Sequence, residues 1–189
     1  MNNFFVLSSV TFSLRLISIL AKFTLFLFLG KYTDTASVGA YGMIATTIVM
    51  LTQILGVEFH YYNTREIQKK PVGQRGGLIK NQFALHLVTY CITFPFLIFF
   101  FIYEFIDYTF ILYFYVLLFF ECVAQELFRI LAANQMPVQA TVSVFLRTVP
   151  WVISTIVLFF LDSQIKIVNT ILFTWIFSSL SAVIFSIFS

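Results

Sequence analysis

The chain has 189 residues, of which 60% are hydrophobic and only 10% are charged, and its formal net charge is +3. Soluble domains carry about 25% charged residues, so this composition excludes a water-soluble globule. It also excludes a disordered chain, which would be polar and rich in charge. An integral membrane protein remains. The two cysteines, Cys91 and Cys122, lie in apolar stretches with no disulfide framework and no metal-ligand spacing, so neither a metal nor a cofactor is expected.

Six segments are long and apolar enough to cross a membrane, which takes about 20 mainly apolar residues in a helix. They are residues 5–29, 38–59, 83–105, 108–132, 138–161 and 167–188. Runs such as Phe94 to Phe101 do not alternate polar with apolar residues, which excludes the strands of a membrane barrel. The sequence therefore predicts an all-α integral membrane protein, with six transmembrane helices in a single lobe over residues 1–189.

The basic residues in the connections predict the orientation of these helices. One side has six of them, namely Arg65, Lys69, Lys70, Arg75, Lys80 and Arg129. The other side has only Lys31 and Lys166, beside the acids Asp34, Glu104, Asp107 and Asp162. Because basic connections stay in the cytoplasm, the segment 61–82, interpreted as a loop, and both termini are predicted to be cytoplasmic. This rule explains the basic segment without a nucleic-acid or phosphoinositide partner, and no nucleic acid is expected.

Polar residues in the first segment recur on one helical stripe. Ser8, Thr11, Arg15, Ser18 and Lys22 follow one another at spacings of three or four residues. Such a stripe either bonds neighbouring helices or lines a cavity that water can reach. The two cations favour the cavity, because helix packing needs no charge and ionisable groups inside a membrane tend to be functional.

Charged residues on three different segments are predicted to share the middle of the membrane. At about 1.5 Å per residue, Arg15, Glu121 and Arg147 lie roughly 14–16 Å from the cytoplasmic ends of their spans. Transporters often bind their substrates at this depth. The predicted substrate cavity consists of Arg15, Lys22, Arg147, Glu121, Ser18, Thr11 and Gln125. Glu121 is expected to pair with Arg15 or Arg147, which leaves an excess of positive charge; the alternative is an ion pair that only locks the bundle.

Other polar residues have plainer interpretations. Glu126 and Arg129 are expected to form an ion pair at the membrane interface, and Glu58 is also expected there. His86 is interpreted as a hydrogen-bonded structural residue, with a proton relay as the alternative. The positions of Trp151 and Trp175, either interfacial or packed, stay open at this point.

The sequence contains none of the short motifs that mark common catalytic sites. There is no Gly-rich loop ending in Lys-Ser/Thr, no His-Glu-x-x-His and no Gly-x-Ser-x-Gly. We therefore expect that the chain is not an enzyme.

Several stretches resemble the first half of one transporter family. They are Leu29-Gly30 followed by Gly39-Ala40-Tyr41-Gly42, then Tyr61 to Ile67, and then Glu126 to Leu131 leading to Phe145 to Trp151. In order and spacing they are similar to polysaccharide flippases, of the O-antigen translocase type, in the multidrug/oligosaccharidyl-lipid/polysaccharide exporter superfamily. The resemblance covers essentially the whole chain but only half of a family member, since these transporters have about twelve spans in two lobes around a central cavity.

The resemblance implies a function and two partners. The chain would be the amino-terminal lobe of a flippase in the bacterial inner membrane, and its substrate would be a lipid-linked oligosaccharide, an undecaprenyl-pyrophosphate-linked repeat unit for surface polysaccharide. The second partner would be another six-helix lobe, either a further copy of the chain or a separate chain.

Three alternatives remain open. A multidrug-type, ion-coupled exporter half would need a cavity dominated by acids, and a membrane polysaccharide polymerase fragment would be expected to carry a large outer loop. A purely structural assembly subunit is the third.

Overall fold

The computed structural model describes residues 2–55, 59–161 and 167–189 of the chain. In this part of the chain all regular structure is helical. Six helical segments are long and apolar enough to cross a membrane, which confirms the predicted all-α membrane class. They are Leu7–Tyr32, Thr35–Ile54, Gly76–Ile102, Tyr108–Ala133, Pro137–Leu161 and Ile167–Phe188.

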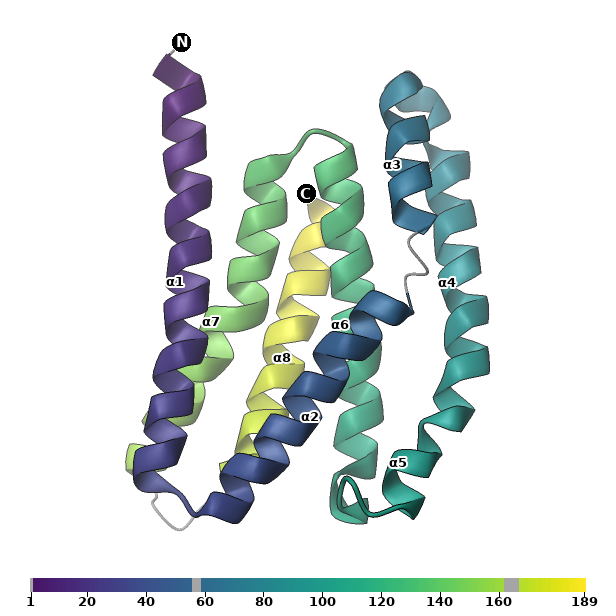
Figure 1. Cartoon of the computed structure of the whole chain (residues 1–189). Coiled ribbons are helices and arrows are strands. Elements are labelled where there is room, and N and C mark those ends of the chain that lie inside the picture. The colour runs from purple at the N-terminus through teal and green to yellow at the C-terminus, as the bar shows by residue number, and fades with distance from the viewer. Residues whose placement is uncertain (1, 56–58, 162–166) are drawn as a thin grey trace.

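The helices form an upright bundle with both termini directed to the same end (Figure 1). In chain order the elements are α1 (Asn2–Tyr32), α2 (Thr35–Ile54), α3 (Phe59–Lys69), the short 3-10 helix η1 (Val72–Gln74), α4 (Gly76–Phe96), α5 (Ile98–Ile102), the 3-10 helix η2 (Tyr108–Phe110), α6 (Ile111–Ala133), α7 (Pro137–Leu161) and α8 (Ile167–Phe188). Helix α7 packs along α1 on one side and α8 on the other, and α6 packs against α7 and α8. Helix α2 crosses in front of α8 and α6, while α3 and α4 form a hairpin beside α6.

Two predicted spans have different boundaries from those expected. The second ends at Ile54 instead of residue 59, and the third begins at Gly76 instead of residue 83. The segment 61–82, expected as a loop, is mostly helical, because α3 has its own buried side at Asn63 and Ile67 while its other face is polar. The third span also breaks near Leu97, just after Pro95, whose nitrogen cannot donate a hydrogen bond to the preceding turn. The charges at Glu58, Asp162 and Lys166 lie outside the described residues.

Polar side chains begin the helices at the end of the bundle opposite α3. Asp34 caps α2, since its carboxylate accepts hydrogen bonds from the backbone N–H of Ser37 at 3.0 Å and from the Ser37 hydroxyl at 2.7 Å. These bonds hold the pKa of Asp34 below its ordinary value, and the bond from the Ser37 hydroxyl has the larger effect. Asp107 accepts the backbone N–H and the hydroxyl of Thr109 in the same way, which starts η2. Both turns are therefore ordered by local hydrogen bonds.

Small and hydroxyl-bearing residues hold α7 against α8. The Ser186 hydroxyl donates to Ser143 Oγ at 2.8 Å, the Ser178 hydroxyl donates to the backbone oxygen of Leu146, and Thr155 and Thr174 share a hydrogen bond of 2.9 Å. Membrane helices associate through small residues and interhelical hydrogen bonds, since lipid offers no hydrophobic drive between them. This contact makes α7 and α8 the rigid wall against which the other helices are placed.

The turn between α6 and α7 is a Schellman motif with an unusual residue at its left-handed position. The backbone N–H of Gln135 bonds the oxygen of Ala132, and the N–H of Met136 bonds the oxygen of Leu131. Gln135 has a φ of 62°, a conformation in which glycine is far more common. The turn therefore stores strain that a glycine would remove.

We expect Gln135→Gly to raise the free energy of unfolding by about 0.5–1 kcal/mol, because glycine adopts positive φ without a Cβ clash. Lys80→Gly, at an exposed position inside α4, is expected to lower it by a similar amount, since glycine disfavours a helix interior. Reversible unfolding in mixed detergent micelles measures both changes. Two effects of the same sign would contradict this account of the turn.

Candidate functional site

A groove of about 400 Å³ lies between α1, α2, α6 and α7. Its polar lining comprises Arg15, Ser18 and Lys22 of α1, Gln53 of α2, Gln125 of α6, and Arg147 and Thr148 of α7, and Ile19, Phe128 and Val144 complete it. Five of the seven residues of the predicted cavity therefore line one space. Thr11 and Glu121 do not line this groove: the Thr11 hydroxyl bonds its own backbone at Leu7, and Glu121 is buried beneath Arg147.

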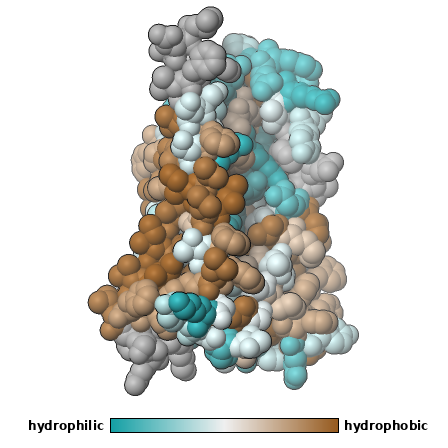
Figure 2. All heavy atoms as spheres, turned by 60° about the vertical axis from the view of Figure 1, so that its left-hand side comes forward, coloured by the Kyte–Doolittle hydropathy of each residue, from teal (hydrophilic) through white to brown (hydrophobic). Residues whose placement is uncertain are grey.

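Two cations of α1, Arg15 and Lys22, line the groove. Arg15 and Lys22 are both exposed, and no hydrogen bond or ion pair links either of them to another described residue. Farther round the helix, α1 is apolar, with Leu16, Leu20 and Leu27 among its exposed residues. Figure 2 shows hydrophobic side chains over much of this side of the molecule. Helix α1 therefore carries Arg15 and Lys22 on its groove side, while the apolar residues on its other side are suited to contact with lipid.

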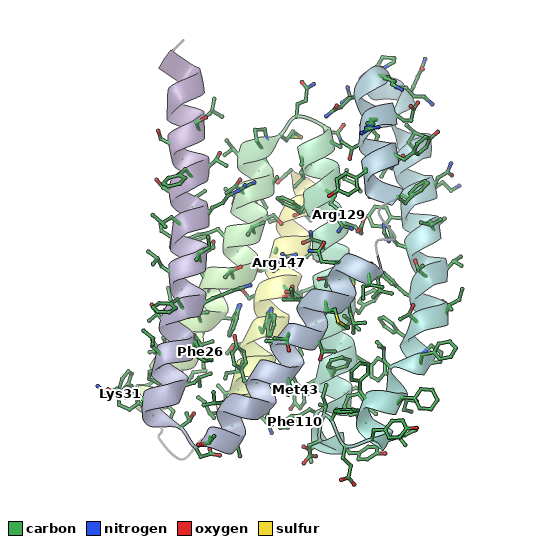
Figure 3. The ribbon with its side chains drawn as sticks, viewed as in Figure 1. Phe26, Lys31, Met43, Phe110, Arg129 and Arg147 are labelled. Atoms are coloured by element: carbon green, nitrogen blue, oxygen red, sulfur yellow. The ribbon has the colours of Figure 1, made fainter. Side chains whose placement is uncertain are left out.

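Glu121 joins three helices behind the groove. Its Oε1 accepts hydrogen bonds from Trp175 Nε1 at 2.9 Å and from the Ser179 hydroxyl at 2.6 Å, both on α8. Its Oε2 lies 3.7 Å from Arg147 Nε on α7, and Arg147 Nη1 donates to Gln125 Oε1 at 2.9 Å. Arg147 lies in the middle of the bundle, in contact with this carboxylate, while its side chain keeps 18% of its surface exposed (Figure 3).

The two tryptophans are packed inside the bundle. Trp151 and Trp175 stack with ring centroids 4.9 Å apart and an angle of 11° between the rings, and both are buried. With Tyr41 and Lys22 they line a hollow of about 330 Å³ that adjoins the groove through Lys22. The hydrogen bond to Glu121 fixes Trp175, so the carboxylate also positions this aromatic wall.

A second carboxylate on α6 is the centre of a separate polar network. Glu126 Oε2 accepts a hydrogen bond from Gln82 Nε2 at 2.7 Å and lies 2.7 Å from His86 Nε2, while Oε1 accepts a bond from Arg129. Gln82 in turn accepts a bond from Asn63 on α3, and Arg129 Nη2 donates to Gln53 on α2 at 3.3 Å. The network therefore connects α2, α3, α4 and α6.

This network contains the expected Glu126–Arg129 ion pair. The pair is buried inside the bundle, with Glu126 2% exposed and Arg129 7% exposed, and its depth relative to the membrane interface stays a prediction. The physical reason for the burial is that Gln82 of α4 donates to the Glu126 carboxylate, while Asn63 of α3, which packs against α6, donates to the Gln82 oxygen and so holds the amide in place. Sequence reasoning missed Asn63, Gln82 and Gln53 as members of one site. Polar residues inside apolar segments were the available signal, but nothing in their spacing indicated that they meet.

Among the described residues, no group of three or more His, Cys, Asp or Glu side chains is placed to hold a metal ion. No protein-family model, curated protein or solved structure matches the chain. The functional argument therefore rests on the groove, its charges and the helices that carry them.

Glu126 and Glu66 each lie three residues before a cation, Arg129 and Lys69. We expect the loss of Glu126 to lower the free energy of unfolding far more than the loss of Glu66. Glu126→Ala leaves the donors of Arg129 and Gln82 without their acceptor inside the bundle and removes the carboxylate beside His86, and we expect it to lower the free energy of unfolding by about 3–5 kcal/mol. Glu66→Ala breaks an exposed i,i+3 pair with Lys69 and is expected to cost less than about 1 kcal/mol.

Unfolding of both variants in mixed micelles, beside the parent chain, provides the comparison. Equal losses in the two variants would mean that the Glu126 network contributes no more than a surface ion pair.

Proposed function

We propose that the chain is the amino-terminal lobe of a flippase that moves a lipid-linked oligosaccharide, with an undecaprenyl-pyrophosphate-linked repeat unit as substrate, across the bacterial inner membrane. The observation that carries this proposal is the charge of the groove. Three cations, Arg15, Lys22 and Arg147, line it, and one carboxylate, Glu121, lies behind it, which leaves a formal excess of two positive charges. An excess of positive charge in an apolar bundle favours an anionic ligand.

The side chains around the groove suit a phosphate in particular. Arginine presents several N–H donors in a planar fork, which matches phosphate oxygens and gives strong charge-assisted hydrogen bonds. Arg147 donates one N–H to Gln125, and its Nε lies near Glu121. Arg15 makes no hydrogen bond to another described residue. Donors therefore remain for a ligand in the groove.

The open side of the groove supports the proposal of a second lobe. A cation that faces hydrocarbon at the centre of a helix costs roughly 2.5–3.5 kcal/mol on insertion scales. Arg15 and Lys22 are both exposed in this chain, so both would carry that cost unless protein or water covers them. A second six-helix lobe, either another copy or a separate chain, would cover this side and enclose an aqueous path.

The charges of the groove favour this function over the alternatives. An exporter of cationic drugs would bring a positive ligand to three cations, which repel it. A polysaccharide polymerase would be expected to carry a large outer loop, and the described connections at that end, around Thr33–Asp34 and Tyr103–Asp107, are short. For the same reason of charge we propose that the end carrying α3, with Arg65, Lys69 and Lys70, is cytoplasmic and that both termini lie there.

Removing one groove cation should reduce export, while removing another cation of the same helix should not. We expect Arg15→Gln, introduced at the chromosomal locus so that any partner lobe is present, to lower surface polysaccharide about tenfold or more, as the loss of a hydrogen bond to a charged ligand implies. Lys31→Gln changes a cation at the far end of α1, away from the groove, and should leave export near the parent level (Figure 3).

Surface polysaccharide is measured by quantitative immunoblotting, with the amount of the chain in the membrane as the control. Equal export in the two variants would remove the groove from the transport path.

The proposed orientation is tested by cysteine labelling. In a background with Cys91 and Cys122 replaced by serine and alanine, a cysteine at the exposed position Gln74 should resist a membrane-impermeant maleimide in intact cells and react after the cells are opened. A cysteine at Ser37, near the opposite end, should react in intact cells. Labelling of the two positions in the reverse pattern would reverse the orientation.

A further inference from the structure

A second hollow continues the groove toward the end of the bundle that carries α3. Its volume is about 480 Å³, and its lining is Gln53, Tyr61, Thr64, Arg65, Gln125, Phe128, Arg129, Ala132 and Ala133. Three of these residues, Gln53, Gln125 and Phe128, also line the groove around Arg15 and Arg147. The two spaces therefore share a wall made by α2 and α6, and Figure 3 places Arg129 nearer to the α3 end than Arg147.

The two glutamines in the shared wall are oriented by the arginines on either side. Gln125 Oε1 accepts a hydrogen bond from Arg147, and Gln53 Oε1 accepts one from Arg129. Each amide oxygen thus points toward an arginine, and each glutamine also carries an NH₂ group that can donate to a ligand. No described residue bonds either NH₂ group, so both are available as donors where the two hollows meet.

The remaining polar side chains of the second hollow are the cations Arg65 and Arg129 and the hydroxyl groups of Tyr61 and Thr64. Arg129 donates two of its five N–H groups, one to Glu126 and one to Gln53. Arg65, which also lines the hollow, is exposed. No Asp or Glu is among the lining residues: Glu126 is buried and paired with Arg129 without lining the hollow, and Glu66 pairs with Lys69. The Thr64 hydroxyl can add one further donor. A space lined by two arginines, with no carboxylate among its lining side chains, favours an anion over a metal ion or a cationic ligand.

We propose that this second hollow is an anion-binding site for a phosphate or pyrophosphate group, formed by Arg65, Arg129, Gln53 and Gln125 and separate from the groove around Arg15 and Arg147. This inference rests on the proposed function, and it divides the path of the substrate into two sites joined by the shared glutamine wall. An anion leaving one site keeps hydrogen bonds to Gln53 and Gln125 while it gains the arginines of the other. The same phosphate chemistry occurs in a lipid-linked pyrophosphate and in the headgroup of an ordinary anionic phospholipid.

The test places one reporter in each space of the purified full chain. In the background without native cysteines, Thr64→Cys reports on the second hollow and Ser18→Cys on the groove. The rate of maleimide labelling is measured against increasing inorganic pyrophosphate, first in detergent and then in phosphatidylcholine nanodiscs with or without phosphatidylglycerol. We expect pyrophosphate to protect both cysteines, each with its own half-protecting concentration. Protection of the Thr64→Cys reporter by phosphatidylglycerol alone would identify a phospholipid headgroup as the source of the phosphate at this site.

A matched pair of charge variants shows whether the second hollow itself binds the anion. Arg65→Gln should raise the half-protecting concentration about tenfold at position 64 and change it less than about twofold at position 18, because it removes one charge-assisted hydrogen bond at one site. Lys80→Gln removes an exposed cation that does not line the hollow and should change neither value. Both positions are exposed, so neither substitution disturbs the packed bundle, and size-exclusion elution of each variant checks this.

The outcomes separate the two proposals. Protection at position 18 without protection at position 64, by pyrophosphate or by phosphatidylglycerol, overturns the second site and leaves the proposed groove intact. Protection at neither position overturns the anionic substrate on which both proposals rest. Equal shifts from Arg65→Gln and Lys80→Gln would show that general surface charge, and not this hollow, attracts the anion, which also overturns the second site.

Discussion

Two carboxylates on α6 have to be surrounded by hydrogen-bond donors, and this requirement decides which helices meet around them. An ionised carboxylate inside an apolar bundle is stable only when partners replace the water it has lost. Glu121 obtains them from α8 and α7, and Glu126 obtains them from α4 and from its own helix. Five residues separate the two, which is about 140° of helix rotation, so the carboxylates bind neighbours on different sides of α6.

The same arrangement leaves donors facing the groove and the second hollow. Arg147 and Arg129 each touch one of the carboxylates and one of the two glutamines, and neither uses all of its N–H groups. The amide oxygens of Gln53 and Gln125 each accept a hydrogen bond from one of these arginines. As a result, buried negative charge fixes the position of the cations, while unused N–H groups of the arginines remain for the two spaces. A network that stabilises the fold thereby also determines the sign of the charge that the spaces accept.

Helix α1 differs from the rest of the bundle in how its polar residues are satisfied. The hydroxyls of Thr11 and Ser18 bond their own backbone one turn back, and neither Arg15 nor Lys22 forms a hydrogen bond or ion pair with another described residue. Its packing comes from α7, helped by aromatic contacts such as Phe28 with Phe159 at 5.1 Å. The helix is therefore held at its apolar residues while its cations remain available to whatever fills the groove.

The sequence by itself determined the membrane class, the six helices long and apolar enough to span a membrane, and five of the seven polar residues that line the groove. Apolar run length and the 3.6-residue period are local properties, so they can be read without the tertiary structure. The sequence did not determine that α3 folds over α6, that the Glu126–Arg129 pair is buried, or that Trp151 and Trp175 stack beneath the groove. Those features depend on contacts between residues far apart in the chain, such as Asn63 with Gln82 and Glu121 with Trp175. Periodicity shows on which face of a helix a polar residue lies, but only tertiary packing decides which other helix supplies its partner.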